Sequence, residues 1–175
     1  MELIGKILSP ENVIAELDAG SKKRAFEQVG QMLEEQLHLG RGKIFDSLFA
    51  REKLGSTGLG HGVAIPHGRI KGLRDTVGVF AHMKQPIPFD APDGAPVSLM
   101  FVLLVPEQAT DLHLQILGEL AHMFSDRHLR ECLNASHDRE TLHRLLTHDS
   151  ARASARGGSE PPRGANPDPH AANQR

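Results

Sequence analysis

An α/β domain is the fold class that this sequence predicts, and two observations lead to it. Helical and strand-like periodicities interleave along the first 150 residues. Residues 97–105 form an almost unbroken apolar run, which is typical of a strand buried on both faces of a sheet. The chain of 175 residues is long enough to bury a core without a structural metal, and its single cysteine excludes a disulfide framework.

Two amphipathic helices are predicted in the first third of the chain. Residues 21–38 carry apolar side chains at helical spacing, with Ser21 as the expected N-cap and Gly40 beyond the end. Residues 43–52 repeat the same spacing. The segment that follows, residues 54–68, is rich in glycine and breaks the helical pattern.

Two strands are predicted next, with turns between them. Residues 76–82 show the alternation of a strand. Pro86 and the pair Asp93-Gly94, among further prolines, predict turns. The apolar run over residues 97–105 is the second strand, and Pro106 ends it.

Three helices are predicted in the last part of the domain. Residues 111–124 form the longest, and shorter helical stretches follow around residues 127–133 and 139–147. The stripe of the first of these helices that we expect to face the core consists of Leu114, Leu117, Ala121 and Phe124.

The C-terminal segment differs in composition from the rest of the chain. Residues 151–175 contain no Val, Ile, Leu, Met, Phe or Cys, and they hold four prolines. Such a segment offers too little apolar surface to offset the entropy of ordering the chain. We therefore expect a single domain over residues 1–150 and a disordered tail, rich in Pro, Gly, Ala and Arg, over residues 151–175.

Charge and hydropathy exclude several classes of function. The 20 Lys and Arg residues are balanced by 22 Asp and Glu residues, which excludes a strongly basic nucleic-acid binder. No segment approaches the about 18 consecutive apolar residues that a membrane span needs. The N-terminus also lacks the pattern of a secretory signal, so we expect a cytoplasmic protein without membrane insertion. The 11 histidines leave open whether they act as nucleophile, acid or base, ligand or surface residues.

The glycine-rich segment over residues 54–68 is the strongest chemical signal. Several glycines in one loop let backbone N–H groups approach an anion such as phosphate. The loop lacks the Gly-Lys-Ser/Thr ending of a nucleotide P-loop, and Val63 stands where a dinucleotide fingerprint needs its third glycine. His67 stands out because Pro66 restricts the backbone before it and Gly68 leaves space beside its ring. Since neutral imidazole is a good nucleophile near neutral pH, His67 is the candidate nucleophile.

A metal site is the alternative for a chain with so many histidines. His61 and His67 are six residues apart and no His-Glu-x-x-His pattern occurs, whereas a zinc site needs three or four convergent ligands. We therefore expect no metal and no cofactor, with His61 as a spectator in the loop. Histidines on polar helical stretches, which we expect to be solvated, are His122, His128, His137, His143 and His148.

The loop and its surroundings resemble a known family. Glu52, residues 59–60 and residues 63–68, at their spacing, look like the signature of the mannitol/fructose-type (type-2) enzyme IIA of the bacterial phosphoenolpyruvate phosphotransferase system. The resemblance covers nearly all of residues 1–150. It implies a central mixed sheet flanked by helices on both faces, and phosphorylation of His67 on the Nε2 atom.

The resemblance also implies that a second histidine and an arginine line the phosphorylation site, at His113 and Arg51. A phosphoryl group in transfer carries negative charge on its oxygens, so a guanidinium fork and a histidine at a helix N-terminus suit it. The alternatives are a satisfied histidine on a buried helix face and an arginine in a surface ion pair. Ser56 and Thr57 are candidate phosphate-binding hydroxyls, although hydroxyls in such turns more often bond their own backbone.

The expected partners follow from the same resemblance. The phosphoryl donor is a small HPr-like phosphocarrier protein. Residues 55–58 and 89–90 look most like the nitrogen-regulatory branch, which implies regulatory targets such as potassium-transport or sensor-kinase proteins that distinguish the two states of His67. A free-standing sugar-specific IIA, which passes the phosphoryl group to a IIB partner, would look the same in sequence and stays open as the alternative.

Overall fold

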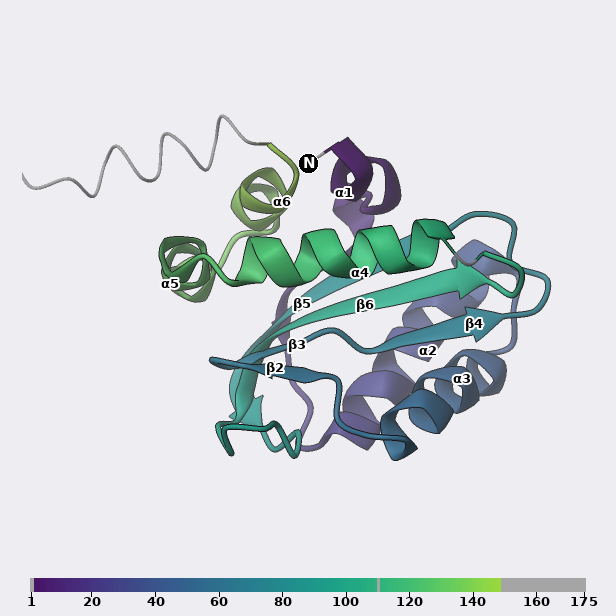
Figure 1. Cartoon of the computed structure of the whole chain (residues 1–175), viewed down its shortest axis with the longest axis horizontal. Helices are drawn as coiled ribbons and strands as arrows, with labels where there is room; N and C mark the ends of the chain where they lie inside the picture. Colours follow the sequence, from purple (N-terminus) through teal and green to yellow (C-terminus); the bar gives the residue numbers. More distant parts are fainter. Residues whose placement is uncertain (1, 110, 149–175) are drawn as a thin grey trace, which may run out of the picture.

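A mixed sheet forms the middle layer of the computed structural model, which describes residues 2–109 and 111–148 (Figure 1). Its strands are β1 Val13–Leu17, β2 Gly58–Gly60, β3 Val63–Ala64, β4 His67–Ile70, β5 Val77–Ile87 and β6 Val97–Pro106. Their spatial order is β1-β5-β6-β3-β2, and β4 also pairs with β6. Strand β1 runs parallel to β5, and strands β3 and β4 both run parallel to β6. The pairs β5–β6 and β2–β3 are antiparallel. The predicted α/β fold with a mixed sheet is confirmed.

Helices cover both faces of this sheet, as predicted. One face carries α2 (Lys22–Leu37) and α3 (Arg41–Lys53), and the other carries α1 (Glu2–Ile7), α4 (Asp111–Phe124), α5 (Arg127–Ala135) and α6 (Arg139–Thr147) (Figure 1). A 3-10 turn, η1 (Pro10–Asn12), precedes β1. No helix in the described part of the chain is long and apolar enough to cross a membrane. The tail expected over residues 151–175 lies outside the described residues.

Strand β6 contributes side chains to two hydrophobic clusters, one on each face of the sheet. Phe101 and Leu103 belong to the cluster packed under α1, α4, α5 and α6. Met100 and Val102 belong to the cluster packed under α2 and α3. All four side chains are completely buried. The prediction of a strand over residues 97–105 that is buried on both faces is therefore confirmed.

The turn predicted at Pro86 is wrong. Strand β5 begins at Val77, close to the expected start, but it continues through Pro86 to Ile87. Its register with β6 is irregular between His82 and Ile87. Because proline cannot donate a ladder hydrogen bond, an irregular stretch is where a strand tolerates it.

The predicted core-facing stripe of α4 is wrong in part, although Phe124 is buried and Leu117 packs against the core as expected. Leu114 is 68% exposed and Ala121 is exposed as well. The helix instead buries His113, Ile116 and Leu120. Most positions of α4 are apolar, so two stripes at helical spacing compete, and packing against the sheet selects the one that contains His113.

Candidate phosphoryl-transfer site

Strands β3 and β4 are consecutive segments along one edge of β6. Val63 and Ala64 pair with β6, Pro66 interrupts the pairing, and His67 resumes it opposite Leu103. The N–H of Leu103 donates to the carbonyl of Pro66 at 2.9 Å, which holds the corner against the buried strand. The imidazole of His67 therefore extends from a fixed backbone.

Helix α3 packs closely on β4 because Gly68 has no side chain. A Cβ atom at this position would lie 2.2 Å from Ser47 Oγ and 3.1 Å from the backbone carbonyl carbon of Ser47. Ser47 Oγ donates to the carbonyl of Arg69 at 2.8 Å. Arg51 lies one turn after Ser47 on the same face of α3. The close approach at Gly68 thus brings Arg51 to the start of β4, where His67 lies.

Two hydrogen bonds fix the ring of His67 and its tautomer. Nδ1 lies 2.9 Å from the carbonyl oxygen of Ile65, and Nε2 lies 3.3 Å from Nε of Arg51. A carbonyl only accepts and a guanidinium only donates, so the proton belongs on Nδ1 and the lone pair on Nε2. Arg51 is itself held in place by a bond from Nη1 to the carbonyl of Gly55 at 2.8 Å.

His113 supplies a second imidazole from the first turn of α4. Its ring centroid lies 5.3 Å from that of His67, with an angle of 74° between the ring planes. The side chain is buried, and its Nδ1 atom has no hydrogen-bond partner among the described residues. The alternative prediction for His113, a histidine on a buried helix face with its hydrogen bonds satisfied, is therefore right about burial but not about the hydrogen bonds. An unpaired buried nitrogen costs stability.

Burial lowers the pKa of both imidazoles. Desolvation is the largest cause of the lowered pKa of His67; the carbonyl bonded at Nδ1 opposes it, and the cation of Arg51 lowers it further. The pKa of His113 is lowered first by desolvation and then by His67 and by Arg69. Both rings are therefore neutral at physiological pH, which is the state that a nucleophile requires.

An NMR titration is expected to place the midpoints of His67 and His113 below the ordinary histidine value of about 6.5. Between these midpoints and the unfolded value, the unfolded chain binds more protons than the folded protein. The two neutral rings therefore contribute to the free energy of unfolding above about pH 6.5, and this contribution is lost as the pH falls through the folded-state pKa values of His67 and His113. Urea unfolding at neutral and at mildly acidic pH measures this loss. A midpoint at or above the ordinary value for either ring would contradict the burial argument.

The side chains of the site border a pocket of about 350 Å³. It is lined by Ser47, Ala50, Arg51, Leu54, His67, Gly68, Arg69 and His113. Among these described residues there are guanidinium and imidazole groups but no carboxylate, so the pocket suits an anion. Arg69 was not singled out from the sequence. Alternation along a strand places residues 67 and 69 on one face of β4, and that signal could have identified it.

The structure brings His67, Arg51 and His113 together but does not bring Ser56 and Thr57 to the pocket. The hydroxyl of Ser56 donates to the carbonyl of Phe89 at 2.6 Å. The hydroxyl of Thr57 donates to the carboxylate of Glu52 at 2.6 Å. Neither residue lines the pocket. Their role in phosphate binding stays a prediction, and the site does not depend on it.

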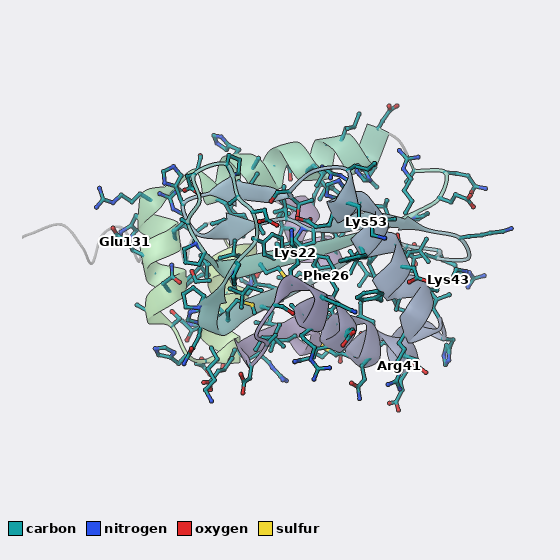
Figure 2. All side chains as sticks on the ribbon, turned by 90° about the horizontal axis from the view of Figure 1, so that it is seen from below. Lys22, Phe26, Arg41, Lys43, Lys53 and Glu131 are labelled. Carbon is teal, nitrogen blue, oxygen red and sulfur yellow. The ribbon has the colours of Figure 1, made fainter. Side chains whose placement is uncertain are left out.

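A buried carboxylate anchors the turn between α3 and β2. Glu52 accepts from the backbone N–H of Thr57 at 3.2 Å and from Nζ of Lys22 at 3.0 Å. Lys22, labelled near the centre of Figure 2, also donates to the carbonyl of Phe89 at 3.3 Å. This cluster fixes the turn that contains Gly55, whose carbonyl holds Arg51. No local motif marks Lys22, because its partners lie far away in the sequence.

The five histidines that were expected to be solvated divide into two groups. His122, His137 and His148 are exposed, as expected. The expectation of solvation is wrong for His143, which is half-buried and has Nε2 2.9 Å from the carbonyl oxygen of Leu8. It is also wrong for His128, which is half-buried with Nε2 3.4 Å from the sulfur of Cys132. Within the described residues, no group of three or more His, Cys, Asp or Glu is placed to hold a metal ion.

Comparison with known proteins assigns the family. The family described as phosphoenolpyruvate-dependent sugar phosphotransferase system, EIIA 2, matches residues 6–149. The chain belongs to this family. As a type-2 EIIA protein, it is a phosphoryl-transfer component of the phosphotransferase system.

Relatives of this type-2 EIIA protein carry two kinds of name. A nitrogen regulatory protein of Pseudomonas aeruginosa is 42% identical over 142 residues, which cover 81% of this chain and 92% of that protein. A nitrogen regulatory protein of Escherichia coli is 39% identical over 147 residues, covering 82% and 89%. A fructose-specific EIIA component of Haloferax volcanii is 34% identical over 106 residues, covering 61% and 69%.

Solved structures agree with the fold. The nitrogen regulatory protein IIA-Ntr of Neisseria meningitidis has 50% sequence identity and a TM-score of 0.79, covering 83% of this chain and 99% of that chain. IIA mannitol of Escherichia coli has 23% identity and a TM-score of 0.67, covering 79% and 97%. The second likeness concerns the fold alone.

Proposed function

We propose that His67 is the phosphoryl acceptor of a nitrogen-regulatory type-2 EIIA protein. The observation that carries this function is the fixed tautomer, with Nδ1 bonded to the carbonyl of Ile65 and the Nε2 lone pair facing Arg51 at 3.3 Å. An imidazole held in this way needs no separate base to act as a nucleophile. The proposed donor is a phosphohistidine on a small HPr-like phosphocarrier protein.

The proposed transfer exchanges one P–N bond for another. The Nε2 lone pair of His67 forms a bond to phosphorus while the P–N bond of the donor breaks, and that electron pair returns to the donor nitrogen. The proton on Nδ1 stays in the hydrogen bond to Ile65, so the product is a phosphorylated imidazolium. The donor ring, protonated on its other nitrogen, leaves as neutral imidazole. Atoms and charge balance without a nucleotide or a metal.

Arg51 and His113 are the proposed catalytic residues beside the nucleophile. Negative charge spreads over the phosphoryl oxygens during transfer, so positioned donors stabilise the transition state. The guanidinium of Arg51 already touches the attacking nitrogen and offers further donors in a rigid fork. His113 brings a buried ring nitrogen without a partner among the described residues, at the N-terminal turn of α4.

We further propose that partner proteins distinguish the two states of His67. Phosphorylation adds a charge of roughly −1.5 to −2 at neutral pH. Leu54 lines the pocket and is 84% exposed, so the charge changes beside an apolar surface that a partner can bind. Regulatory targets, such as potassium-transport or sensor-kinase proteins, would bind one state in preference. The names of the relatives from Pseudomonas aeruginosa and Escherichia coli support this branch.

A sugar-specific role is the second candidate, favoured by the name of the Haloferax volcanii relative. In that role, phosphorylated His67 passes its phosphoryl group to a IIB partner. A pull-down from the native cell extract with wild type and with His67→Asp separates the two functions. Recovery of regulators that prefer one form supports regulation, whereas recovery of a IIB protein supports sugar transport.

Phosphoryl transfer from the carrier tests the proposed acceptor. Wild-type protein, mixed with phosphorylated HPr-like carrier, is expected to gain one phosphoryl group on Nε2 of His67, because Nδ1 is occupied by its bond to Ile65. Intact-mass measurement counts the groups, and phosphorus–nitrogen correlation NMR identifies the ring atom. A phosphoryl group on Nδ1 or on another residue would overturn the assignment.

A further inference from the structure

Arg69 is a cation at the pocket that the mechanism above does not use. It lies two residues after His67 on β4, so both side chains lie on the same face of the strand. Its backbone carbonyl accepts from Ser47 Oγ at 2.8 Å, which fixes the start of the side chain against α3. Arg69 therefore extends from a held backbone position and not from a loose loop.

The guanidinium of Arg69 is only weakly engaged. Among the described residues its one hydrogen bond runs from Nη1 to the backbone carbonyl of Glu107 at 3.3 Å, and it makes no ion pair there. A guanidinium carries five N–H donors, so most of them are free for a ligand.

The two arginines of the pocket approach from different elements. Arg51 comes from α3 and Arg69 from β4, and His67, at the start of β4, lines the same pocket. Arg51 is directed to Nε2 of His67 by its hydrogen bond, whereas Arg69 is directed toward the segment after β6 by its bond to Glu107. A phosphoryl group has three terminal oxygens, more than one guanidinium fork can bind.

We propose that Arg69 is a second phosphate-binding residue, which donates to phosphoryl oxygens that Arg51 does not reach when the group lies on Nε2 of His67. This role rests on the proposed function of His67. The ligand is a dianionic phosphoryl group, and the two guanidinium charges balance its two negative charges. The absence of a carboxylate from the described pocket lining leaves both cations available for it.

The electrostatic effect of Arg69 on the neighbouring ring gives an independent readout. Its cation is one of the causes that lower the pKa of His113, after burial and the charge of His67. Removing that charge from the pocket is expected to raise the NMR titration midpoint of His113. An arginine that pointed away from the site would leave this midpoint unchanged.

Phosphoramidate, a small P–N donor, provides a test that does not involve a carrier protein. The variants are Arg69→Gln, Arg69→Lys and the control Arg74→Gln, which removes an exposed arginine that does not line the pocket. Labelling of His67 by phosphoramidate is followed by intact mass. Arg69→Gln is expected to react about tenfold to a hundredfold more slowly than wild type, which is the loss of one charge-assisted hydrogen bond. Arg69→Lys, with charge but no fork, is expected to react at an intermediate rate, and Arg74→Gln at the wild-type rate.

The outcomes separate this inference from the proposed function. If wild type is labelled on His67 and Arg69→Gln reacts as fast as Arg74→Gln, with the His113 midpoint unmoved, then Arg69 does not bind the phosphoryl group. If wild type is not labelled at all, the proposed acceptor role of His67 fails and the role of Arg69 fails with it. Slow labelling of Arg69→Gln, together with a raised His113 midpoint, supports the second phosphate-binding residue.

Discussion

Replacement of His67 by alanine is expected to abolish phosphoryl acceptance from the HPr-like carrier, with a rate loss of about 10⁴-fold or more. In the proposed transfer the new P–N bond forms on Nε2, and no other described imidazole has its lone pair held against Arg51. His113 lies close by, but its ring is not oriented by a carbonyl and an arginine as the ring of His67 is. Intact-mass measurement of single-turnover reactions detects the loss.

Two control variants make the result specific. His67→Gln keeps a polar side chain of similar size, so its unfolding curve shows whether loss of acceptance occurs in a folded protein. His122→Ala removes an exposed histidine of α4, the helix that carries His113, and is expected to react like wild type. If the His67→Ala variant still gains a phosphoryl group on any residue, His67 is not the acceptor.

The setting of the proposed acceptor, His67, could be predicted from the sequence because it is local. Pro66 and Gly68 are chain neighbours of His67, and each acts through short-range geometry. Pro66 interrupts the pairing with β6, and Gly68 leaves space for α3 to pack on β4. The buried strand over residues 97–105 was predictable for a similar reason, since a run of apolar residues can be read without knowledge of its partners.

Other parts of the site depend on contacts between distant segments. Arg51 approaches His67 only because α3 packs on β4 at Gly68, and spacing along the chain does not report that packing. The buried face of α4 was predicted wrongly in part, because an apolar helix has two possible stripes, and packing against the sheet selected the one with His113. Arg69 was not identified from the sequence, because the short strand β4, whose alternation marks it, begins inside the glycine-rich segment.

Strand β1 shows the same limit away from the site. Its five residues, Val13–Leu17, are too few to distinguish a strand from one turn of helix by periodicity. Its conformation is set by parallel pairing with β5, at the far edge of the sheet. Elements of this length take their structure from their neighbours, so sequence alone left this one unassigned.

Replacement of Glu52 by alanine is expected to give the largest loss of stability, about 3 kcal/mol in the free energy of unfolding. The side chain of Glu52 is 3% exposed, and its carboxylate accepts from the side chain of Lys22 and from the backbone and hydroxyl of Thr57. Without it, the half-buried ammonium of Lys22 loses its buried carboxylate partner, and the buried N–H of Thr57 loses its acceptor. Urea unfolding of wild type and variant measures the difference.

Glu131→Ala is the matched control, because Glu131 also pairs with a basic side chain but lies at the surface. Its partner is Arg127 at 3.0 Å, the two side chains are 85% and 61% exposed, and Figure 2 shows Glu131 at the periphery of the molecule. Loss of such a pair is expected to change stability by no more than about 0.5 kcal/mol. Equal losses of unfolding free energy for Glu52→Ala and Glu131→Ala would mean that the burial of Glu52 does not add to stability.

The same substitution should also slow phosphoryl acceptance, although Glu52 does not line the pocket. Glu52 fixes the turn that contains Gly55, and the carbonyl of Gly55 holds the guanidinium of Arg51. A looser turn leaves His67 in place but lets Arg51 move away from its Nε2 atom. Glu52→Gln, which keeps an acceptor for Thr57, is therefore expected to recover part of the rate and part of the stability, whereas a purely catalytic role of the carboxylate would allow no such recovery.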